Sequence, residues 1–144
     1  MHLIKLCVGI ETLEELAAWQ AHRLDVMKRA GVTPELVHRT RQTPRQGDAV
    51  LKSGSLYWVI KGFIRGRQRI LALREETGTE GKPLCGIVLD RTLIATRPQP
   101  RRPFQGWRYL KPEEAPADLG AVADLASSDI PPAMRAELAE LALL

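Results

Sequence analysis

The sequence predicts an α+β fold: an N-terminal strand and an amphipathic helix, then a curved, mostly antiparallel sheet or partial barrel, and a C-terminal helix. Three observations lead to this prediction. Residues 2–9 form a short apolar run, residues 12–29 carry apolar side chains at helical spacing, and residues 54–74 have the pattern of two strands joined by a tight turn. A short, strongly twisted sheet of this kind can close into a partial barrel.

Local signals define the first strand and helix. Residues 2–9 are rich in Leu, Ile and Val, which predicts a buried strand. Thr12 and Glu15 form a capping box, in which a hydroxyl and a carboxylate each satisfy a backbone N–H at the start of the helix. Gly31 is a natural terminator. The side chains predicted on the buried face of this helix are Leu13, Leu16, Ala17, Gln20, Leu24 and Met27.

Residues 54–74 are predicted to form the central hairpin. Residues 56–60 are apolar at every position, so this strand is expected to be covered on both faces and to lie inside the sheet. Trp58 is therefore predicted to be a core residue. The turn is placed at residues 62–66, which have a glycine at each end, and the second strand is expected to leave it at Arg67.

Weaker signals predict the remaining elements. Residues 35–42 are expected to be extended, and Pro44 to begin a short helix that is capped by Thr43 and ends near Gly54. Residues 97–110 contain three prolines, so most of this segment is expected to be an ordered loop or a sheet edge. We also expect further strands of a meander at 84–89 and 93–97, a loop with one helical turn at 112–119, and the C-terminal helix within 128–144.

Length and composition predict a single domain over residues 1–144. The hydrophobic content of 44% and the charged content of 26% are typical of folded, soluble proteins. No window has the apolar length that crosses a bilayer, so no membrane partner is expected, and Lys5 interrupts the apolar start in a way that signal peptides do not. Cys7 and Cys85 are expected to be free thiols in a reducing, cytoplasmic environment.

Positive charge is concentrated in the middle of the chain. Residues 36–111 hold 16 Lys and Arg against 5 Asp and Glu, whereas the two ends together hold 5 basic and 12 acidic residues. A basic middle between acidic ends suggests a polyanionic partner. The alternative is that these arginines only solvate the surface of the sheet.

The sequence contains no recognisable catalytic or metal-binding motif. His2, His22 and His38 lie on different predicted elements, and neither cysteine has a partner at ligand spacing, so no metal and no cofactor is expected. Residues 62–66 lack the Gly-Lys-Ser/Thr ending of a phosphate-binding loop, and there is no Gly-x-Ser-x-Gly nucleophile elbow. What remains is arginine combined with aromatic residues. Guanidinium groups suit phosphate oxygens, and aromatic rings stack on bases.

Four segments resemble an uncharacterised family of bacterial domains of unknown function that have about this length. The resemblance covers the chain from residue 1 to about 119 and implies no particular activity; its motifs are MHLIKL at 1–6, GSLYWVIKG at 54–62, RQRILAL at 67–73 and RPFQGWRYL at 102–110. A weaker resemblance, in element order and charge only, is to the small RNA-binding barrels of the PUA-like superfamily, including the ASCH and EVE domains. It implies a curved barrel with a basic rim.

The leading hypothesis is a small binding module for RNA or another phosphate-bearing ligand. The alternatives are an enzyme that clamps a small anionic or nucleotide substrate with the same arginines, and a protein–protein adaptor that uses the acidic ends and the aromatic loop. Trp107 is assigned to the surface as a base-stacking residue, although packing within its loop is an equal alternative. The predicted nucleic-acid or anion-binding residues are Arg39, Arg41, Lys61, Arg65, Arg67, Arg69, Arg101, Arg102, Trp107 and Arg108.

Overall fold

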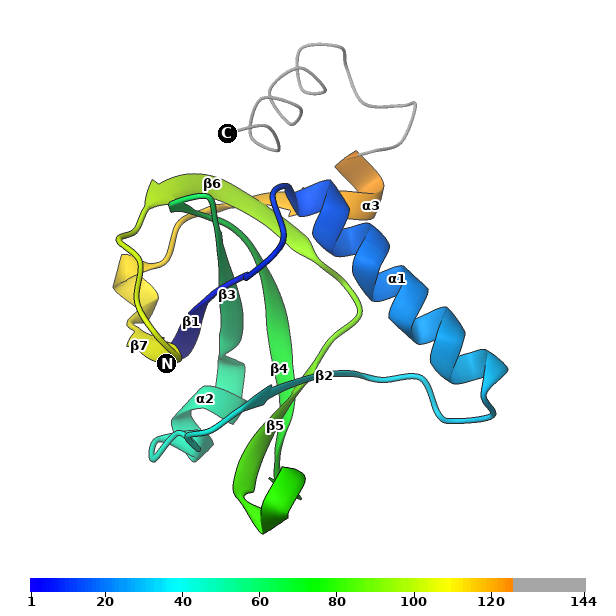
Figure 1. Ribbon diagram of the computed structural model, residues 1–144. Helices are drawn as coiled ribbons and strands as arrows, with labels where there is room; N and C mark the ends of the chain where they lie inside the picture. The colour runs from blue at the N-terminus through cyan, green and yellow to red at the C-terminus, as the bar shows by residue number, and fades with distance from the viewer. Residues whose placement is uncertain (126–144) are drawn as a thin grey trace.

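Eight strands of the described chain form one open, strongly curved sheet, and a long helix packs against one face of it (Figure 1). The computed structural model describes residues 1–125. In chain order the elements are β1 (His2–Leu6), α1 (Leu13–Arg29), β2 (Leu36–Thr40), α2 (Gly47–Ser53), β3 (Ser55–Ile60), β4 (Phe63–Thr77), β5 (Pro83–Leu89), β6 (Ile94–Pro100), β7 (Trp107–Leu110), β8 (Asp118–Ala121) and α3 (Val122–Leu125). Two short 3₁₀ turns lie at Thr79–Gly81 and Pro112–Glu114.

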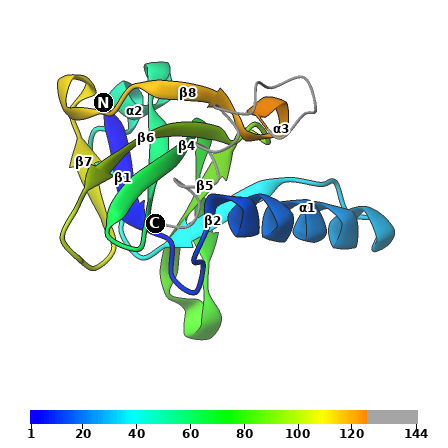
Figure 2. The ribbon, with the colours of Figure 1, turned by 90° about the horizontal axis from the view of Figure 1, so that it is seen from above.

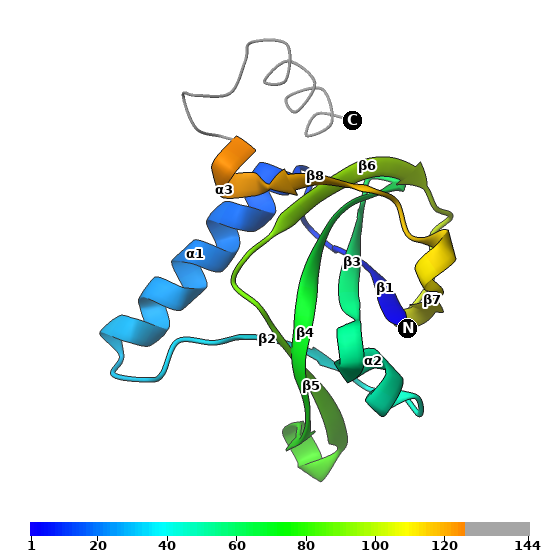
Figure 3. The same cartoon turned by 180° about the vertical axis from the view of Figure 1, so that it is seen from behind.

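The strand order is β2-β5-β4-β3-β1-β7, and β6 pairs with both β4 and β8. Strands β1 and β3 run parallel, and every other pair within residues 1–125 is antiparallel. Strand β4 pairs with β6 near Ile64 and with β5 beyond Ile70, and its register shifts at both places. Register shifts of this kind bend a strand, which accounts for the curvature in Figure 3. The predicted α+β class with a curved, mostly antiparallel sheet is confirmed.

Helix α1 begins at the predicted cap. The Thr12 hydroxyl accepts a hydrogen bond from the Glu15 N–H at 3.0 Å, and the Glu15 carboxylate accepts one from the Glu11 N–H at 3.3 Å. Helix α1 is held against the sheet mainly by its first half, through Leu13, Leu16 and Gln20; Leu24 is the last of its side chains that packs on the core, and its C-terminal end extends away (Figure 2). The helix approaches β4 closely at Gly66, where an added Cβ would lie 2.7 Å from the Leu13 Cδ1.

The hairpin turn is shorter than the sequence suggests. Lys61 and Gly62 form a two-residue turn with φ of 50° and 82°, so β4 begins at Phe63 and the turn predicted at 62–66 is wrong. Two successive positive φ values match the right-handed twist of the flanking strands. Asn-Gly is the usual signal for such a turn, and here a lysine occupies the first position. Strand β3 is buried along its whole length, as predicted.

Long-range contacts account for the other differences from prediction. Helix α2 begins at Gly47 rather than at Pro44, because the preceding residues bond to β7: the Gln46 N–H donates to the Tyr109 hydroxyl, and the Trp107 indole donates to the Gln42 carbonyl. Strand β6 is not a neighbour of β5 in a meander, since β2 occupies that side of β5. Strand β8 was not predicted, and the helix predicted within residues 128–144 lies outside the described residues.

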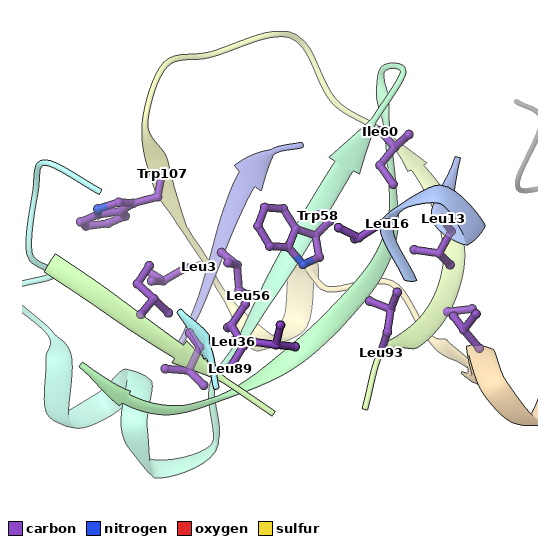
Figure 4. Close-up of a cluster of buried hydrophobic side chains, with 14 of the residues drawn as sticks. Leu3, Leu13, Leu16, Leu36, Leu56, Trp58, Ile60, Leu89, Leu93 and Trp107 are labelled. Carbon is purple, nitrogen blue, oxygen red and sulfur yellow. The ribbon is translucent and has the colours of Figure 1, made fainter. Parts of the chain in front are cut away.

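The hydrophobic core consists of two layers that share β3. Leu56, Trp58 and Ile60 face the larger layer with the first half of α1, whereas Tyr57 and Val59 face a smaller layer on the other side of the sheet. Figure 4 shows Trp58 between Leu56 and Leu16 in the larger layer. Trp58 is only 4% exposed, which confirms its predicted place in the core.

Candidate functional site: a cationic hairpin end and a cavity beside helix α1

The structure holds Arg101 at the end of the central hairpin beside Lys61, and two further predicted cations, Arg102 and Arg108, lie along the chain that continues from it. The Arg101 N–H donates to the Gly62 carbonyl at 2.8 Å, which joins the segment after β6 to the β3–β4 turn beside Lys61. Arg102 follows as an exposed residue, and the Arg108 guanidinium stacks over the Phe104 ring at 5.5 Å. The Phe104 ring packs against the smaller core layer, to which Ile64 belongs. We call Lys61, Arg101, Arg102 and Arg108 the hairpin-end surface.

The cations of the hairpin-end surface differ in how many ion pairs and hydrogen bonds they make within the protein. The Lys61 ammonium lies 3.6 Å from the Glu11 carboxylate, but both side chains are exposed, so this pair is weak. Arg101 donates to the Gln99 side chain, and Arg108 donates to the carbonyls of Gln105 and Trp107. Each of these arginines retains N–H groups beyond those in use, because a guanidinium has five, but the Arg101 Nε is buried and has no partner in the described structure.

The remaining predicted cations lie elsewhere, and most are already bonded within the fold. Arg67 makes two hydrogen bonds to the Asp118 carboxylate, at 2.7 and 2.8 Å, which ties β4 to β8 and keeps the pKa of Asp118 below its usual value. Arg39 on β2 pairs with Glu76 of β4. Arg69 donates to the Lys52 carbonyl at 3.3 Å. Arg41 is exposed beside the β4–β5 turn.

Two predicted site residues are enclosed by the protein. Arg65 is 2% exposed; its Nε donates to the Ile60 carbonyl at 3.0 Å, and burial lowers its pKa. Trp107 is 8% exposed, and its indole N–H donates to the Gln42 carbonyl at 2.8 Å. The Trp107 ring also meets Tyr109 edge to face, with 4.8 Å between ring centroids. Hence the Trp107 indole fixes β7 against the loop before α2.

A second candidate site, a cavity of about 260 Å³, lies between α1 and the adjacent ends of β1, β2 and β3. Sequence reasoning did not find it, because it combines residues from five elements, β5 included. We call it the α1 cavity. Its cationic groups are Lys5 from β1 and Arg23 from α1, and no Asp or Glu lines it. Trp58 forms part of the cavity wall, and Trp19, which is 52% exposed, lines it from α1.

A buried amide pair supports one side of the α1 cavity. Gln20 and Gln68 exchange two side-chain hydrogen bonds, each 2.8 Å long, and the Gln68 oxygen also accepts the Trp58 indole N–H at 2.9 Å. The Gln68 amide donates in addition to the Asp90 carbonyl at 3.1 Å. The two amides and the indole thus satisfy one another's hydrogen bonds and fix the orientation of the Trp58 ring. Ligand binding is therefore left to the other polar groups of the cavity.

His38 is the polar group of the α1 cavity that lacks a partner. Its Nε2 is buried and has no hydrogen-bond partner in the described structure, and its ring meets Trp58 edge to face at 5.2 Å. Burial, together with the nearby charges of Lys5 and Arg23, lowers the pKa of His38 to about 4. The imidazole is therefore neutral at physiological pH.

Cys7 also lines the α1 cavity, but its chemistry is limited. Burial raises the pKa of the Cys7 thiol to about 11, so at neutral pH it is protonated and a poor nucleophile. Both Cys7 and the buried Cys85 are free. Among residues 1–125, no cluster of three or more His, Cys, Asp or Glu is arranged to hold a metal ion.

Two features of the sequence belong to the α1 cavity, but they lie far apart in the chain and do not indicate a common site. Lys5 stands inside an otherwise apolar strand, and Arg23 lies three residues from the buried Gln20 on the same helix. A charge inside a buried strand indicates that water or a ligand reaches that position. The other charged and polar side chains of the cavity, Arg23 and His38, come from α1 and β2. Only the folded structure shows that they lie beside Lys5.

Comparison with known proteins identifies a family. The model of the family described as "Protein of unknown function (DUF1489)" matches residues 3–144, nearly the whole chain. No curated protein and no solved structure matches the chain. Within residues 1–125, no helix has the length and apolar character needed to cross a membrane.

Proposed function

We propose that this chain, a member of the DUF1489 family, is a small module that binds single-stranded RNA through the phosphates of its backbone. The observation that supports the proposal is the hydrogen bond from the Arg101 N–H to the Gly62 carbonyl, because it holds Arg101 and the following Arg102 beside the turn that carries Lys61. A group of cations on a rigid protein surface attracts the phosphates along a nucleic-acid strand. Planar guanidinium groups also match the geometry of phosphate oxygens.

Because Trp107 is buried, we expect RNA binding through phosphate contacts rather than through base stacking. A ring whose N–H is bonded to Gln42 has little surface for stacking on a base. We therefore expect phosphate contacts to dominate, which gives similar affinity for different sequences and a strong dependence on salt.

A titration of labelled single-stranded RNA at several salt concentrations tests this function. Four phosphate contacts predict that log K falls with log salt with a slope of about −3. The double variant Arg102→Ala/Arg108→Ala should reduce the slope by roughly 1–1.5 and weaken all sequences alike. The control is Lys28→Ala/Lys82→Ala, which removes two exposed charges outside the hairpin-end surface and should leave the slope unchanged. Absence of binding at low salt and micromolar protein rejects the proposal.

A second candidate function, suggested by the α1 cavity, is an enzyme acting on a small anionic or nucleotide substrate. The cavity has cations for substrate binding, but its imidazole, His38, is a weak base because its pKa is lowered to about 4. It has no lining carboxylate, and the Cys7 thiol is protonated at neutral pH, so the support is stronger for binding than for a reaction.

A further inference from the structure

Two cations, Lys5 and Arg23, and the unpartnered imidazole of His38 line the α1 cavity, and no ion pair within residues 1–125 neutralises the two cations. None of the five ion pairs within residues 1–125 involves Lys5 or Arg23, and the buried His38 Nε2 has no hydrogen-bond partner there. Two cations in a hollow without a carboxylate give it a positive potential, and walls of low polarity strengthen that potential. A buried polar atom without a partner costs free energy unless a ligand or water satisfies it.

We propose that the α1 cavity binds a small phosphate monoester that carries a planar ring. The charge of Lys5 and Arg23 selects an anion. When the proton of the neutral imidazole is on Nε2, His38 is a third donor, and three donor groups suit the three terminal oxygens of a phosphate better than the two of a carboxylate.

The aromatic walls and the size of the cavity specify the rest of the ligand. Trp58, held by the bond from its indole N–H to Gln68, is 4% exposed and only closes the wall, whereas Trp19 presents a ring that is 52% exposed at the same cavity. An exposed indole ring favours a planar ring in the ligand. A volume of about 260 Å³ lies just below the usual range of roughly 300–1,000 Å³ for ligand pockets, so the ligand is small.

This inference stands apart from the proposed RNA binding. The charged and polar groups proposed to hold the ligand in the α1 cavity lie on β1, α1 and β2, whereas the hairpin-end surface uses the β3–β4 turn, the segment after β6, and β7. The two sites have no cation in common. A protein that fails to bind RNA can therefore still bind a phosphate monoester, and the reverse also holds.

Calorimetric titration of the full chain with phenyl phosphate and AMP tests the ligand class, with tryptophan fluorescence as a second readout. Both phosphate esters should bind, and benzoate and adenosine should bind at least about tenfold more weakly because each lacks the phosphate. Absence of binding by both esters at millimolar concentration overturns the proposal. Equal affinity for benzoate and phenyl phosphate overturns the assignment of phosphate.

Substitutions test whether the ligand occupies this cavity. Lys5→Met and Arg23→Gln should each weaken phenyl phosphate binding about ten- to hundredfold, the range for loss of a charge-assisted contact. Lys28→Gln removes an exposed cation of the same helix and should change the affinity less than twofold. Arg23 is exposed, so its variant keeps the fold even where Lys5→Met does not. Equal affinities of Arg23→Gln and Lys28→Gln overturn the site.

A spectroscopic readout follows His38 directly. Addition of phenyl phosphate should shift the imidazole nitrogen resonances of His38 and leave those of His2 unchanged, because His2 does not line the cavity and its Nδ1 accepts from the Ser55 N–H. A merely structural role for His38 predicts no shift on addition of ligand. Binding of phenyl phosphate without a shift at His38 therefore removes His38 from the ligand contacts and overturns the three-donor assignment.

Discussion

The role of each arginine in this protein depends on its partners. Arg67 and Arg65 stand two positions apart on β4, yet Arg67 forms a bidentate pair with Asp118, whereas Arg65 is buried with a single hydrogen bond to Ile60. The two terminal nitrogens of Arg65 have no partner in the described part of the chain, and the Phe63 ring lies 5.2 Å from its guanidinium carbon. Cation–π attraction replaces only part of the lost hydration.

Replacement of Arg65 by methionine should therefore not destabilise the protein. Arg65→Met removes a buried charge and keeps most of the side-chain volume, so we expect a free energy of unfolding between unchanged and about 2 kcal/mol higher. Urea denaturation measures it. Arg69→Met, at an exposed position of the same strand, is the control and should stay within about 0.5 kcal/mol. A loss of more than about 1 kcal/mol for Arg65→Met contradicts this account.

His38 should make stability depend on pH. Its pKa of about 4 in the folded state lies below the ordinary 6.5, so between these values the unfolded chain binds a proton that the folded chain does not. The contribution is fully present above pH 6.5 and is lost as the pH falls, by up to about 3 kcal/mol at pH 4. The groups that oppose the imidazolium are the charges of Lys5 and Arg23.

Urea denaturation between pH 7 and pH 5 isolates this effect from the titration of most carboxyl groups. The wild type should lose stability over this range, and His38→Gln should lose less, because the difference in proton uptake is gone. His22→Gln, at an exposed position on α1, should behave like the wild type. Parallel curves for His38→Gln and the wild type would show that His38 titrates normally in the folded protein.

At the scale of elements, local signals were sufficient for α1 and β3 but not for the turn after β3. The Thr12 cap and the unbroken apolar run of β3 act over a few residues, so both could be predicted from the sequence. Lys61 is unfavourable in the left-handed region, and nothing in its neighbourhood indicates that it adopts φ of 50°. The pairing of the two long flanking strands imposes that conformation.

Lys61→Asn should therefore stabilise the hairpin. Asparagine tolerates the left-handed region better than lysine, and Asn-Gly is the preferred pair for this turn, so we expect a gain of about 0.5–1 kcal/mol in thermal or urea denaturation. The same substitution removes a cation of the hairpin-end surface, so RNA affinity should fall while stability rises. A loss of stability would mean that the pair between Lys61 and Glu11 outweighs the backbone strain.

At the scale of the whole molecule, the sites depend on contacts that the sequence does not encode locally. In the hairpin-end surface, residue 101 is held next to the turn by its hydrogen bond to residue 62. In the α1 cavity, side chains of β1 and β2 meet although three strands separate β1 from β2 in the sheet. The concentration of positive charge at residues 36–111 was visible in the sequence. Which of those charges are free depends on partners such as Asp118 and Glu76, which are far away in the chain.

The two core layers share β3, so we expect them to unfold together. Trp58→Ala in the larger layer should cost about 3–5 kcal/mol, and Ile64→Ala in the smaller layer about 2–5 kcal/mol. Each should move the whole transition, with far-UV circular dichroism and tryptophan fluorescence changing at the same urea concentration, because neither layer retains a wall once β3 is released. Two separate transitions in Ile64→Ala, with fluorescence unchanged in the first, would show that the larger layer with α1 is stable on its own.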